Sequence, residues 1–591
     1  MSESRSTQPR HIEHANNNVR GPLILSDNPR IRAQRLIRLA GSRTNLLFAG
    51  TRVEVRGSGE LADAVRETLR GFGARMRGTD RPRLVFVTDD LANNPRALAA
   101  EYGVAAGGIP TLLVSDEPSA RISRVLTTRG WAASELRAGV VGFSREGRVI
   151  AVIEAAVEPG ADNADSRIDW AWSAMPATAA LAAELSSSGL LSGRRIGVSL
   201  VLEPKTAALA VALTDAGAEV AVFSADSETD PAVAAALSAR GVRVCAPGGA
   251  GAAATDAENA AAILDWAPDL LIDDGSHLVR LAHTERRGTL DTLRGAAEET
   301  TSGVRPLVEM AAEGELTIPV IAVNDARTKG LFDNLHGTGQ SCVLAIADLL
   351  DPVAHPARTL PLRDILGARW LVIGFGPVGQ GVARHAAALG ADVSVLDRDP
   401  VRALAAAHDG YGVLSNIDDS ELTEIDVVVS ATGVWHTVDL ALLERVAADT
   451  VVAVAGGIDD EIALDDARDA GWSVREITPQ VSAWSAPERP ERTVYVLADG
   501  GGVNYTAAEG NPIEVMDLSF ATQLVALRQL SNGGLEPGLH PIDTAAEAEV
   551  AGLVLEQRMG RTTLALQATP DRAGGAAQHW STHRYRATPA E

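Results

Sequence analysis

Cysteines, aromatic residues, long apolar runs and dense basic clusters are all scarce in this sequence. Its two cysteines among 591 residues, Cys245 and Cys342, cannot supply a disulfide framework and are expected to be buried free thiols in a reducing compartment. No apolar run approaches the roughly 18 residues that cross a bilayer, which argues against a membrane protein. A formal net charge of −24 without a lysine and arginine cluster argues against nucleic acid as a partner. Metal ligands are also lacking, so no metal site is expected.

The two ends of the chain differ from the rest. Residues 1–20 are polar and lack the apolar centre of a signal peptide, which predicts a disordered leader on a cytoplasmic protein. Residues 546–591 are expected to form a C-terminal tail.

Between these ends, short runs rich in Val, Ile and Leu alternate with helical patterns. This alternation predicts an α/β protein with doubly wound, parallel sheets. Polar or small-residue joints near 155–166 and 351–360 divide the chain into three blocks. The expected strands lie within residues 83–89, 111–116, 194–203, 218–225, 269–275, 370–376, 391–397, 426–433, 450–457 and 493–501.

A complete G-x-G-x-x-G fingerprint follows the expected strand at 370–376 and opens a helical stretch. The first glycine allows the tight turn, the second lets a pyrophosphate approach the backbone, and the third allows close packing of helix on strand. The motif therefore predicts a bound dinucleotide. The expected contacts are Gly374, Gly376, Pro377, Val378 and Gly379.

The next expected strand ends in Asp397, 18 residues past the third glycine. A carboxylate at this place accepts hydrogen bonds from the ribose diol and repels a 2′-phosphate, which favours NAD over NADP. Arg398, also a candidate contact, weakens that preference slightly.

A weaker match to the glycine fingerprint lies at residues 57–62, after an expected strand that contains charged residues. The segment that should form its second strand, residues 74–80, has little strand character. The block is therefore expected to be a structural Rossmann-like module without cofactor.

Residues 323–337, VNDARTKGLFDNLHG, resemble the V-N-D-x-x-T-K-x-x-F-D-N-x-x-G signature that precedes the NAD-binding unit in S-adenosylhomocysteine hydrolases. The likeness extends over about residues 166–560, and ordered agreement over that length is far more specific than one motif. Further matches in register are Ile272 to Gly275, Glu298 to Val304, Gly374 to Gly381, Thr432-Gly433, Gly456, Asp459 to Ile462, and Val503-Asn504.

The resemblance implies a domain plan for the three blocks. Residues 165–345 would form a substrate-binding domain that about 512–545 complete, and residues 346–508 an NAD-binding Rossmann domain. Residues 21–160 would then be an extra N-terminal Rossmann-like domain. A homo-oligomer, either a dimer or a tetramer, is also implied.

Lys329 and Asp333 are four residues apart and can share one face of a turn, which poises an amine for proton transfer. The resemblance implies that this pair engages the ribose hydroxyls and assists oxidation at C3′, with Asn334 tuning the lysine. It makes Asp274 a candidate base for the 4′ proton and Glu299 a second acidic site residue.

Other contacts come from the resemblance alone. Those implied for the cofactor are Thr300, Thr301, Ser302, Asn334, Thr432, Gly433 and Asn504. Those implied for an adenine nucleoside substrate are Glu203, Lys205, Thr206, Gly457 and Asn511, together with Asp274, Glu299, Lys329 and Asp333.

The family chemistry explains how NAD serves a reaction without net redox change. Oxidation of the 3′ hydroxyl acidifies the 4′ proton, the 5′ substituent leaves, a nucleophile adds, and the ketone is reduced again. NAD acts as a catalyst in this scheme.

Three family histidines are replaced here, by Val201, Gly457 and Asn511. An imidazole titrates near neutral pH without tuning, so its loss changes the acid–base work at the 5′ position. We expect Gly457 to open room for an extra hydroxymethyl group. The C-terminal tail also lacks the family's final lysine and tyrosine arrangement.

These replacements favour a nucleoside 4′,5′-dehydratase that performs oxidation, elimination and reduction but no addition of water. Such an enzyme resembles the angustmycin-type dehydratases of nucleoside-antibiotic biosynthesis. Two alternatives remain: an adenosylhomocysteinase that hydrolyses S-adenosylhomocysteine, and a non-enzymatic NAD-binding regulator, for which the added N-terminal block is the only positive feature.

Overall fold

The computed structural model describes residues 28–78, 80–88, 94–105, 109–115, 120–155, 163–351, 365–414, 422–457 and 460–559. The expected leader at 1–20, most of the expected tail, Asp459 and large parts of both joints lie outside these residues. The predicted α/β class is confirmed: helices cover three separate sheets, and the strands predicted from Val, Ile and Leu runs are all present.

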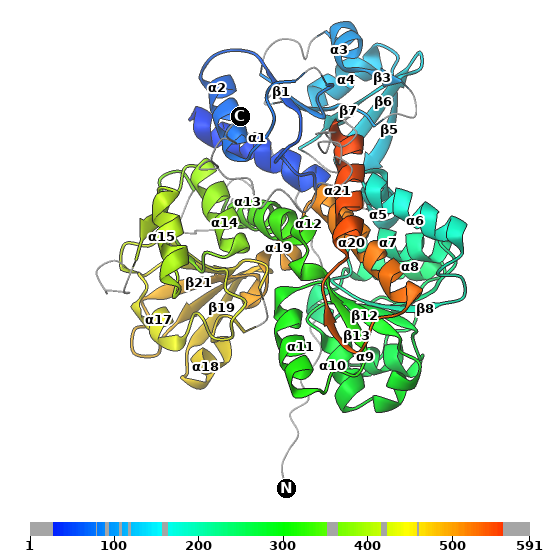
Figure 1. The fold of residues 1–591 in the computed structure, drawn as a ribbon. Coiled ribbons are helices and arrows are strands. Elements are labelled where there is room, and N and C mark those ends of the chain that lie inside the picture. Colours follow the sequence, from blue (N-terminus) through cyan, green and yellow to red (C-terminus); the bar gives the residue numbers. More distant parts are fainter. Residues whose placement is uncertain are drawn as a thin grey trace, which may run out of the picture.

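The first sheet belongs to the N-terminal unit, drawn in blue and cyan in Figure 1. Its order is β1-β2-β4-β7-β6-β5, with β3 paired to β7. The helices are α1 (Pro29–Thr44), α2 (Glu60–Gly71), α3 (Pro95–Tyr102) and α4 (Ala120–Thr128). The strands are β1 (Val53–Arg56), β2 (Leu84–Val87), β3 (Val104–Ala105), β4 (Leu112–Ser115), β5 (Ala132–Arg137), β6 (Val140–Arg145) and β7 (Arg148–Ile153).

The expectation of purely parallel sheets is wrong for this unit, because β5, β6 and β7 form an antiparallel meander. Two tight turns make it possible: Gly139 and Gly147 both have positive φ, a conformation that glycine adopts without steric cost.

The second sheet, order β10-β9-β8-β11-β12-β13-β22, is parallel throughout. Its strands are β8 (Arg195–Ser199), β9 (Glu219–Phe223), β10 (Arg243–Cys245), β11 (Leu270–Asp273), β12 (Gly295–Glu298), β13 (Pro319–Ala322) and β22 (Gly538–His540). The helices around it are α5 (Ala164–Ser173), α6 (Pro176–Ser188), α7 (Pro204–Asp215), α8 (Pro231–Ala239), α9 (Asp256–Asp265), α10 (His277–Thr284), α11 (Thr301–Glu313), α20 (Ile513–Asn532) and α21 (Thr544–Met559).

The third sheet, order β16-β15-β14-β17-β18-β21-β20-β19, is parallel up to β21 and ends in an antiparallel hairpin. Its strands are β14 (Arg369–Ile373), β15 (Asp392–Leu396), β16 (Gly412–Val413), β17 (Val427–Ser430), β18 (Val451–Val454), β19 (Ser473–Thr478), β20 (Val481–Ser485) and β21 (Thr493–Leu497). Its helices are α14 (Pro377–Ala388), α15 (Pro400–His408), α17 (Leu440–Arg445), α18 (Leu464–Asp469) and α19 (Val503–Thr506).

The chain crosses between the second and third sheets twice. The first crossing contains α12 (Arg327–Lys329), a π-helix at Gly330–Gly337 and α13 (Thr338–Leu350); the second is the stretch from β21 to α20. Figure 1 shows α13 and α20 at the centre of the molecule, beneath the N-terminal unit. A π-helix turn is rare and often lies at a functional site.

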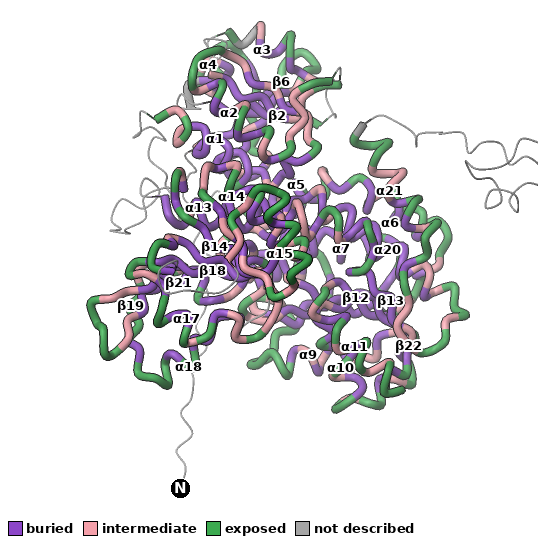
Figure 2. Tube along the Cα trace, turned by 60° about the vertical axis from the view of Figure 1, so that its left-hand side comes forward, coloured by how far each residue is buried: buried purple, intermediate pink, exposed green. Residues whose placement is uncertain are grey.

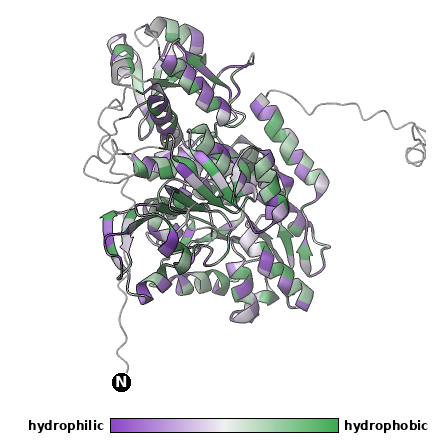
Figure 3. Ribbon diagram, turned by 90° about the vertical axis from the view of Figure 1, so that its left-hand side faces the viewer, coloured by the Kyte–Doolittle hydropathy of each residue, from purple (hydrophilic) through white to green (hydrophobic). Residues whose placement is uncertain are grey.

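The strands carry the core. The central strands of the second and third sheets are almost entirely buried, whereas the edge strands β16, β19 and β22 and the outer helices are partly exposed (Figure 2). Hydropathy follows the same division, with apolar residues concentrated in the strands (Figure 3). Both cysteines are buried and free, as predicted. Within the described residues, no helix is long and apolar enough to cross a membrane.

Candidate active site

A cavity of about 1270 Å³ lies between the second and third sheets. It opens at the carboxyl ends of parallel strands, where ligands bind in doubly wound folds. On the side of the second sheet its lining includes Val201, Asp274, Thr300, Thr301 and Ser302, and from the first crossing it includes Asn334. From the third sheet it includes Gly374, Gly376, Pro377, Val378, Asp397, Arg398, Thr432, Gly433, Gly456 and Gly457.

The glycine fingerprint forms the cradle that its spacing predicts. Gly374 has φ +95°, and a Cβ there would lie 2.9 Å from the Ala431 carbonyl oxygen. A Cβ on Gly379 would overlap the Gly374 carbonyl oxygen, so α14 packs on the turn only with glycine at this position. At Gly376 the nearest atom to a Cβ is Arg402 Nη1 at 3.7 Å, so the backbone there faces open space into which a pyrophosphate fits.

Asp397 ends β15 beside this cradle. Its Oδ2 accepts a hydrogen bond from the Phe375 amide at 2.6 Å, and its Oδ1 accepts one from the Asp399 amide at 2.8 Å. The carboxylate therefore fixes the glycine turn and still lines the cavity next to Arg398.

Asn504 is a buried residue whose side-chain oxygen lies near Gly456 of the cavity lining. Its Nδ2 donates to Asn511 Oδ1 at 3.0 Å, whereas its Oδ1 is buried without a hydrogen-bond partner. An orphaned buried acceptor costs free energy, and the amide hydrogens of a carboxamide would satisfy it. The glycine cradle and Asn504 together fit the cofactor.

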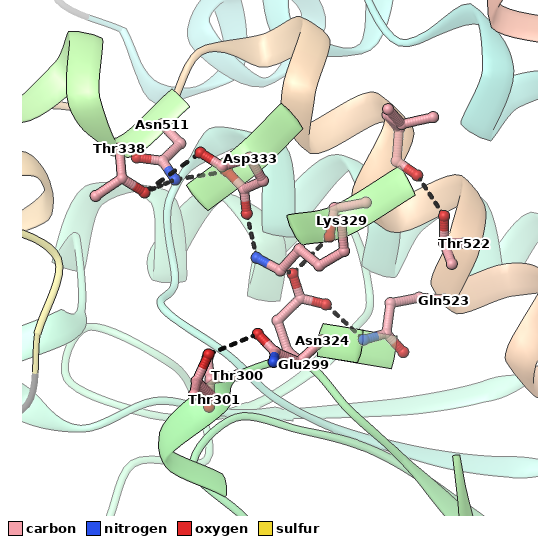
Figure 4. Close-up of polar contacts among 12 residues, drawn as sticks. Glu299, Thr300, Thr301, Asn324, Lys329, Asp333, Thr338, Asn511, Thr522 and Gln523 are labelled. Atoms are coloured by element: carbon pink, nitrogen blue, oxygen red, sulfur yellow. Dashed lines mark hydrogen bonds and ion pairs between the residues drawn. The ribbon is translucent and has the colours of Figure 1, made fainter. Parts of the chain in front are cut away.

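Lys329 lies at the centre of a buried polar cluster (Figure 4). Its Nζ contacts Asp333 Oδ2, one helical turn later, and lies 2.9 Å from Glu299 Oε1. Burial opposes the charged amine, but the charges of Asp333 and Glu299 outweigh it and raise the pKa of Lys329 above its ordinary value. At neutral pH the lysine is therefore a charged hydrogen-bond donor.

Glu299 is oriented by α20, which is distant in the sequence. Ser519 donates to Glu299 Oε1 and Gln523 donates to Oε2, each at 2.5 Å. Both donors are fully buried. The carboxylate is thus fixed before any substrate arrives.

Asn511 holds Asp333 from the other side. Its Nδ2 donates to Asp333 Oδ1 at 2.6 Å and to Thr338 Oγ1 at 2.9 Å. Its Oδ1 accepts from Ser341 Oγ at 2.8 Å and from Asn504. The Asn511 side-chain amide thus has a partner at every hydrogen-bonding position.

Asp274 stands at the end of β11 and faces the cavity. Burial and the charge of nearby Glu299 raise the pKa of Asp274 to about 6, although a hydrogen bond from Thr300 opposes the shift. A carboxyl group with this pKa changes its protonation state close to neutral pH, as a general base requires.

The cofactor-side threonines and serine lie together at the start of α11. Thr300 caps the helix by accepting from the Gly303 amide and donates to Glu298 Oε1 at 2.9 Å. Thr301 donates to Asn324 Oδ1 at 3.0 Å, and Ser302 donates to Thr300 Oγ1 at 3.1 Å. Asn334 is half-buried at the cavity wall.

The expected open space at Gly457 is not found on the side where a side chain would project. A Cβ on Gly457 would overlap Glu461 Oε1. Glu461 is fully buried and accepts hydrogen bonds from Ser430, from Thr432 Oγ1 at 3.1 Å and from the Gly433 amide at 3.0 Å. A buried carboxylate therefore occupies the volume that the sequence suggested was free.

Glu203, Lys205 and Thr206 lie apart from the cavity lining. Lys205 Nζ pairs with Glu203 Oε2 at 2.7 Å and donates to the Glu509 carbonyl oxygen at 2.7 Å. Thr206 donates to the Val201 carbonyl oxygen at 2.7 Å. These side chains brace the loop that carries Val201, which does face the cavity.

Sequence reasoning assigned no role to several residues that shape the site. Four of them lie outside every recognised motif: Thr338, Ser341, Ser519 and Gln523. The fifth, Glu461, lies inside the Asp459 to Ile462 match but had no role assigned to it. The only hint in the sequence is their placement in apolar segments, where a buried polar group needs a partner.

The fold and the cleft define a dinucleotide-binding α/β protein with a buried lysine and carboxylate centre. Two family models match it: the S-adenosyl-L-homocysteine hydrolase model over residues 159–291, and the NAD-binding domain model of the same enzyme over residues 361–510. The chain belongs to the S-adenosyl-L-homocysteine hydrolase family, and its third sheet is the core of an NAD-binding domain.

Curated relatives agree with this assignment. An S-inosyl-L-homocysteine hydrolase of Methanopyrus kandleri is 36% identical over 396 residues, which cover 66% of this chain and 89% of the relative. An adenosylhomocysteinase of Thermotoga maritima is 35% identical over 395 residues, which cover 66% of this chain and 94% of the relative. Among solved structures, an NAD⁺-bound 3-phosphoglycerate dehydrogenase of Entamoeba histolytica matches with a TM-score of 0.34 and 11% identity, covering 58% of this chain and 95% of that one.

Proposed function

We propose that the protein cleaves the C5′ substituent of a purine nucleoside through temporary oxidation at C3′, and that its substrate is the thioether of an S-nucleosyl-L-homocysteine. One observation carries the proposal: Lys329, held between Asp333 and Glu299, directly precedes Gly330, which lines the same cavity as the glycine cradle. Bound NAD would supply the acceptor for the C3′ hydride and return that hydride at the end of the cycle.

The Lys329 and Asp333 pair handles the 3′ hydroxyl. The proton of the 3′ hydroxyl passes through the Lys329 amine to the Asp333 carboxylate. The charged amine donates a hydrogen bond to the 3′ oxygen. The same donor stabilises the negative charge that develops on that oxygen when the 4′ proton leaves. Asn511 and Glu299 keep both partners in place.

Asp274 acts on the 4′ proton. The 3′ ketone makes this proton acidic, and a carboxylate with a pKa of about 6 is a suitable acceptor near neutral pH. Loss of the proton drives the electron pair toward C5′ and expels homocysteine as a thiol. Addition of water to the 4′,5′ double bond and reduction of the ketone then give the nucleoside.

The names of the two relatives support a thioether substrate, a nucleoside joined to homocysteine. They differ in the base of that nucleoside, which is hypoxanthine in one and adenine in the other. We take the adenine nucleoside as the substrate, and the hypoxanthine nucleoside is the competing choice.

A second candidate, 4′,5′-dehydration without addition of water, is supported by the absence of imidazole at three positions. Val201 and Gly457 face the cavity with no group that titrates, and the Asn511 amide is fully engaged with its neighbours. If no imidazole activates water at these three positions, elimination would leave a 4′,5′-unsaturated nucleoside, although His277 supplies an imidazole elsewhere in the cavity lining.

One experiment separates these functions. NAD-loaded protein is mixed with S-adenosyl-L-homocysteine, S-inosyl-L-homocysteine or a 5′-hydroxylated adenine ketohexose nucleoside, while absorbance at about 340 nm reports NADH. Release of homocysteine supports the proposed hydrolysis. A product lighter by one water supports dehydration. No transient NADH with any of these nucleosides would contradict both and favour a regulator.

A further inference from the structure

The N-terminal unit is joined to both segments that connect the second and third sheets. At the first crossing, Gln340 of α13 accepts from the Phe48 amide and donates to the Leu46 carbonyl oxygen, each at 2.9 Å. Beyond it, Asp351 forms buried ion pairs with Arg35 at 3.4 Å and with Arg38.

At the second crossing, the N-terminal unit holds residues 509–514. The Asn45 side chain donates to the carbonyl oxygens of Glu509 at 3.1 Å and Gly510 at 3.4 Å. The backbone carbonyl oxygen of Asn45 accepts from the Ile513 amide at 2.9 Å. Arg137 of β5 pairs with Glu509 at 2.7 Å, and its side chain is only 6% exposed.

Residue 511 lies inside this clamped segment, and its amide holds Asp333. A continuous chain of contacts therefore runs from Asn45 and Arg137, through Glu509 and Gly510, to the Asn511 amide and the Lys329 centre. Glu509 is charged at neutral pH, so its ion pair with Arg137 is maintained. The positive charges of Arg137, Arg167 and Lys205 outweigh the effect of burial and lower the pKa of Glu509 to about 2.

We propose that Asn45 and Arg137 are positioning residues for the reaction, and that the N-terminal unit serves as a brace that holds Asn511 on Asp333. No described residue of the N-terminal unit lines the cavity, so the unit acts through residues 509–511 and not by touching substrate. Sub-ångström errors in the placement of a catalytic group are costly, so loosening this segment should slow the oxidation step more than substrate binding.

The conformation of Asn45 allows a clean test. It has φ 50° and ψ 34° at the end of α1, a left-handed conformation in which glycine is unstrained. Asn45→Gly removes the amide and keeps the backbone, whereas Asn45→Asp keeps the oxygen that faces Lys205 but loses the donor. Arg137→Met removes the charge at similar size, and Arg137→Lys restores one charged donor.

A matched control lies in the same unit. Arg56 pairs with Glu101 at 2.9 Å on a partly exposed surface, away from both crossings. Arg56→Gln removes an ion pair of the same unit without touching residues 509–514.

The full-length, NAD-loaded proteins are assayed for turnover and for the rate of NADH appearance on mixing with the nucleoside. Asn45→Gly and Arg137→Met should each lower kcat and the NADH rate by about 5- to 20-fold and leave KM within about twofold. Arg137→Lys should recover part of the loss, and Arg56→Gln should match the wild type. An unchanged kcat, a loss confined to KM, or an equal loss in Arg56→Gln would overturn the proposal.

The kinetic readout rests on the proposed function, so amide hydrogen exchange supplies an independent one. The Ile513 and Gly510 amides are bonded to the Asn45 and Asn504 carbonyl oxygens. Faster exchange across residues 509–513 in Asn45→Gly, but not in Arg56→Gln, supports the brace even if no nucleoside reduces the cofactor. Unchanged exchange there overturns the brace, whereas absent NADH in the wild type overturns only the proposed function.

Discussion

The Asn511 amide donates to Asp333 Oδ1 at 2.6 Å, on the opposite oxygen from the one that contacts Lys329. The carboxylate is therefore held from both sides, by an amide and by an ammonium group. An asparagine in place of the family histidine keeps a donor for this carboxylate but cannot take or release a proton at neutral pH.

Substitutions of Asn511 should separate these two properties. Asn511→Ala removes a hydrogen bond to a charged group and should lower the rate of NADH formation by about 10- to 100-fold. Asn511→Asp places a second carboxylate against Asp333, and repulsion should make it the slower variant above pH 7. Stopped-flow absorbance at several pH values measures both. Equal rates for the two variants would contradict this account.

Lys329→Met should remove the charged donor of the site while leaving an apolar chain of similar length. We expect NADH formation to fall by about 1000-fold or more, with NAD still bound, because the lysine acts on the 3′ oxygen and not on the dinucleotide cradle. The neighbouring Arg327 is the control: its side chain is 69% exposed and pairs with Glu547 at 2.9 Å. Arg327→Gln should retain most of the rate, and a comparable loss there would argue against a special role for Lys329.

Local parts of this site were readable from the sequence. Lys329 and Asp333 are one helical turn apart, and the glycine cradle is contiguous, so spacing alone brought their members together. Asp274 and the threonines of α11 follow strands that end at the same sheet edge, where side chains of parallel strands meet.

Long-range partners were not readable in the same way. Ser519 and Gln523 reach Glu299 across 220 and 224 residues, and Asn511 reaches Asp333 across 178. Nothing in a single sequence fixes which polar residue of a buried helix meets which carboxylate. The space beside Gly457 was misjudged for a different reason: the carboxylate that fills it belongs to Glu461, only four residues further along the chain, and spacing alone did not show that this side chain turns back toward the glycine. The antiparallel β5–β7 meander was missed because β5 is mostly polar and exposed and so has no apolar run to mark it as a strand.

The pH dependence of the reaction should follow Asp274. Its folded-state pKa of about 6 lies above the usual value, so the group is protonated, and inactive as a base, below that pH. The rate of the elimination step should therefore rise about tenfold per pH unit below pH 6 and level off above it. Exchange of the 4′ proton with deuterated solvent, followed by mass spectrometry, isolates this step. In Asp274→Asn the exchange should be lost while NADH still forms, and exchange that persists with the same acid limb would assign the base elsewhere.

The glycines of the cradle should respond to alanine in two different ways. A Cβ on Gly379 overlaps the Gly374 carbonyl oxygen, so α14 must move off the strand, and Gly379→Ala should destabilise the fold by about 2–3 kcal/mol. A Cβ on Gly376 has 3.7 Å to its nearest neighbour, so Gly376→Ala should fold normally but occupy the space into which the pyrophosphate fits. Calorimetry of the cofactor-free proteins should show a lower melting temperature only for Gly379→Ala, and titration with NAD should show Gly376→Ala weakened by about 10- to 100-fold. Normal NAD affinity in Gly376→Ala would place the pyrophosphate away from this turn. The methyl group is fixed to the backbone and would collide with phosphates bound there.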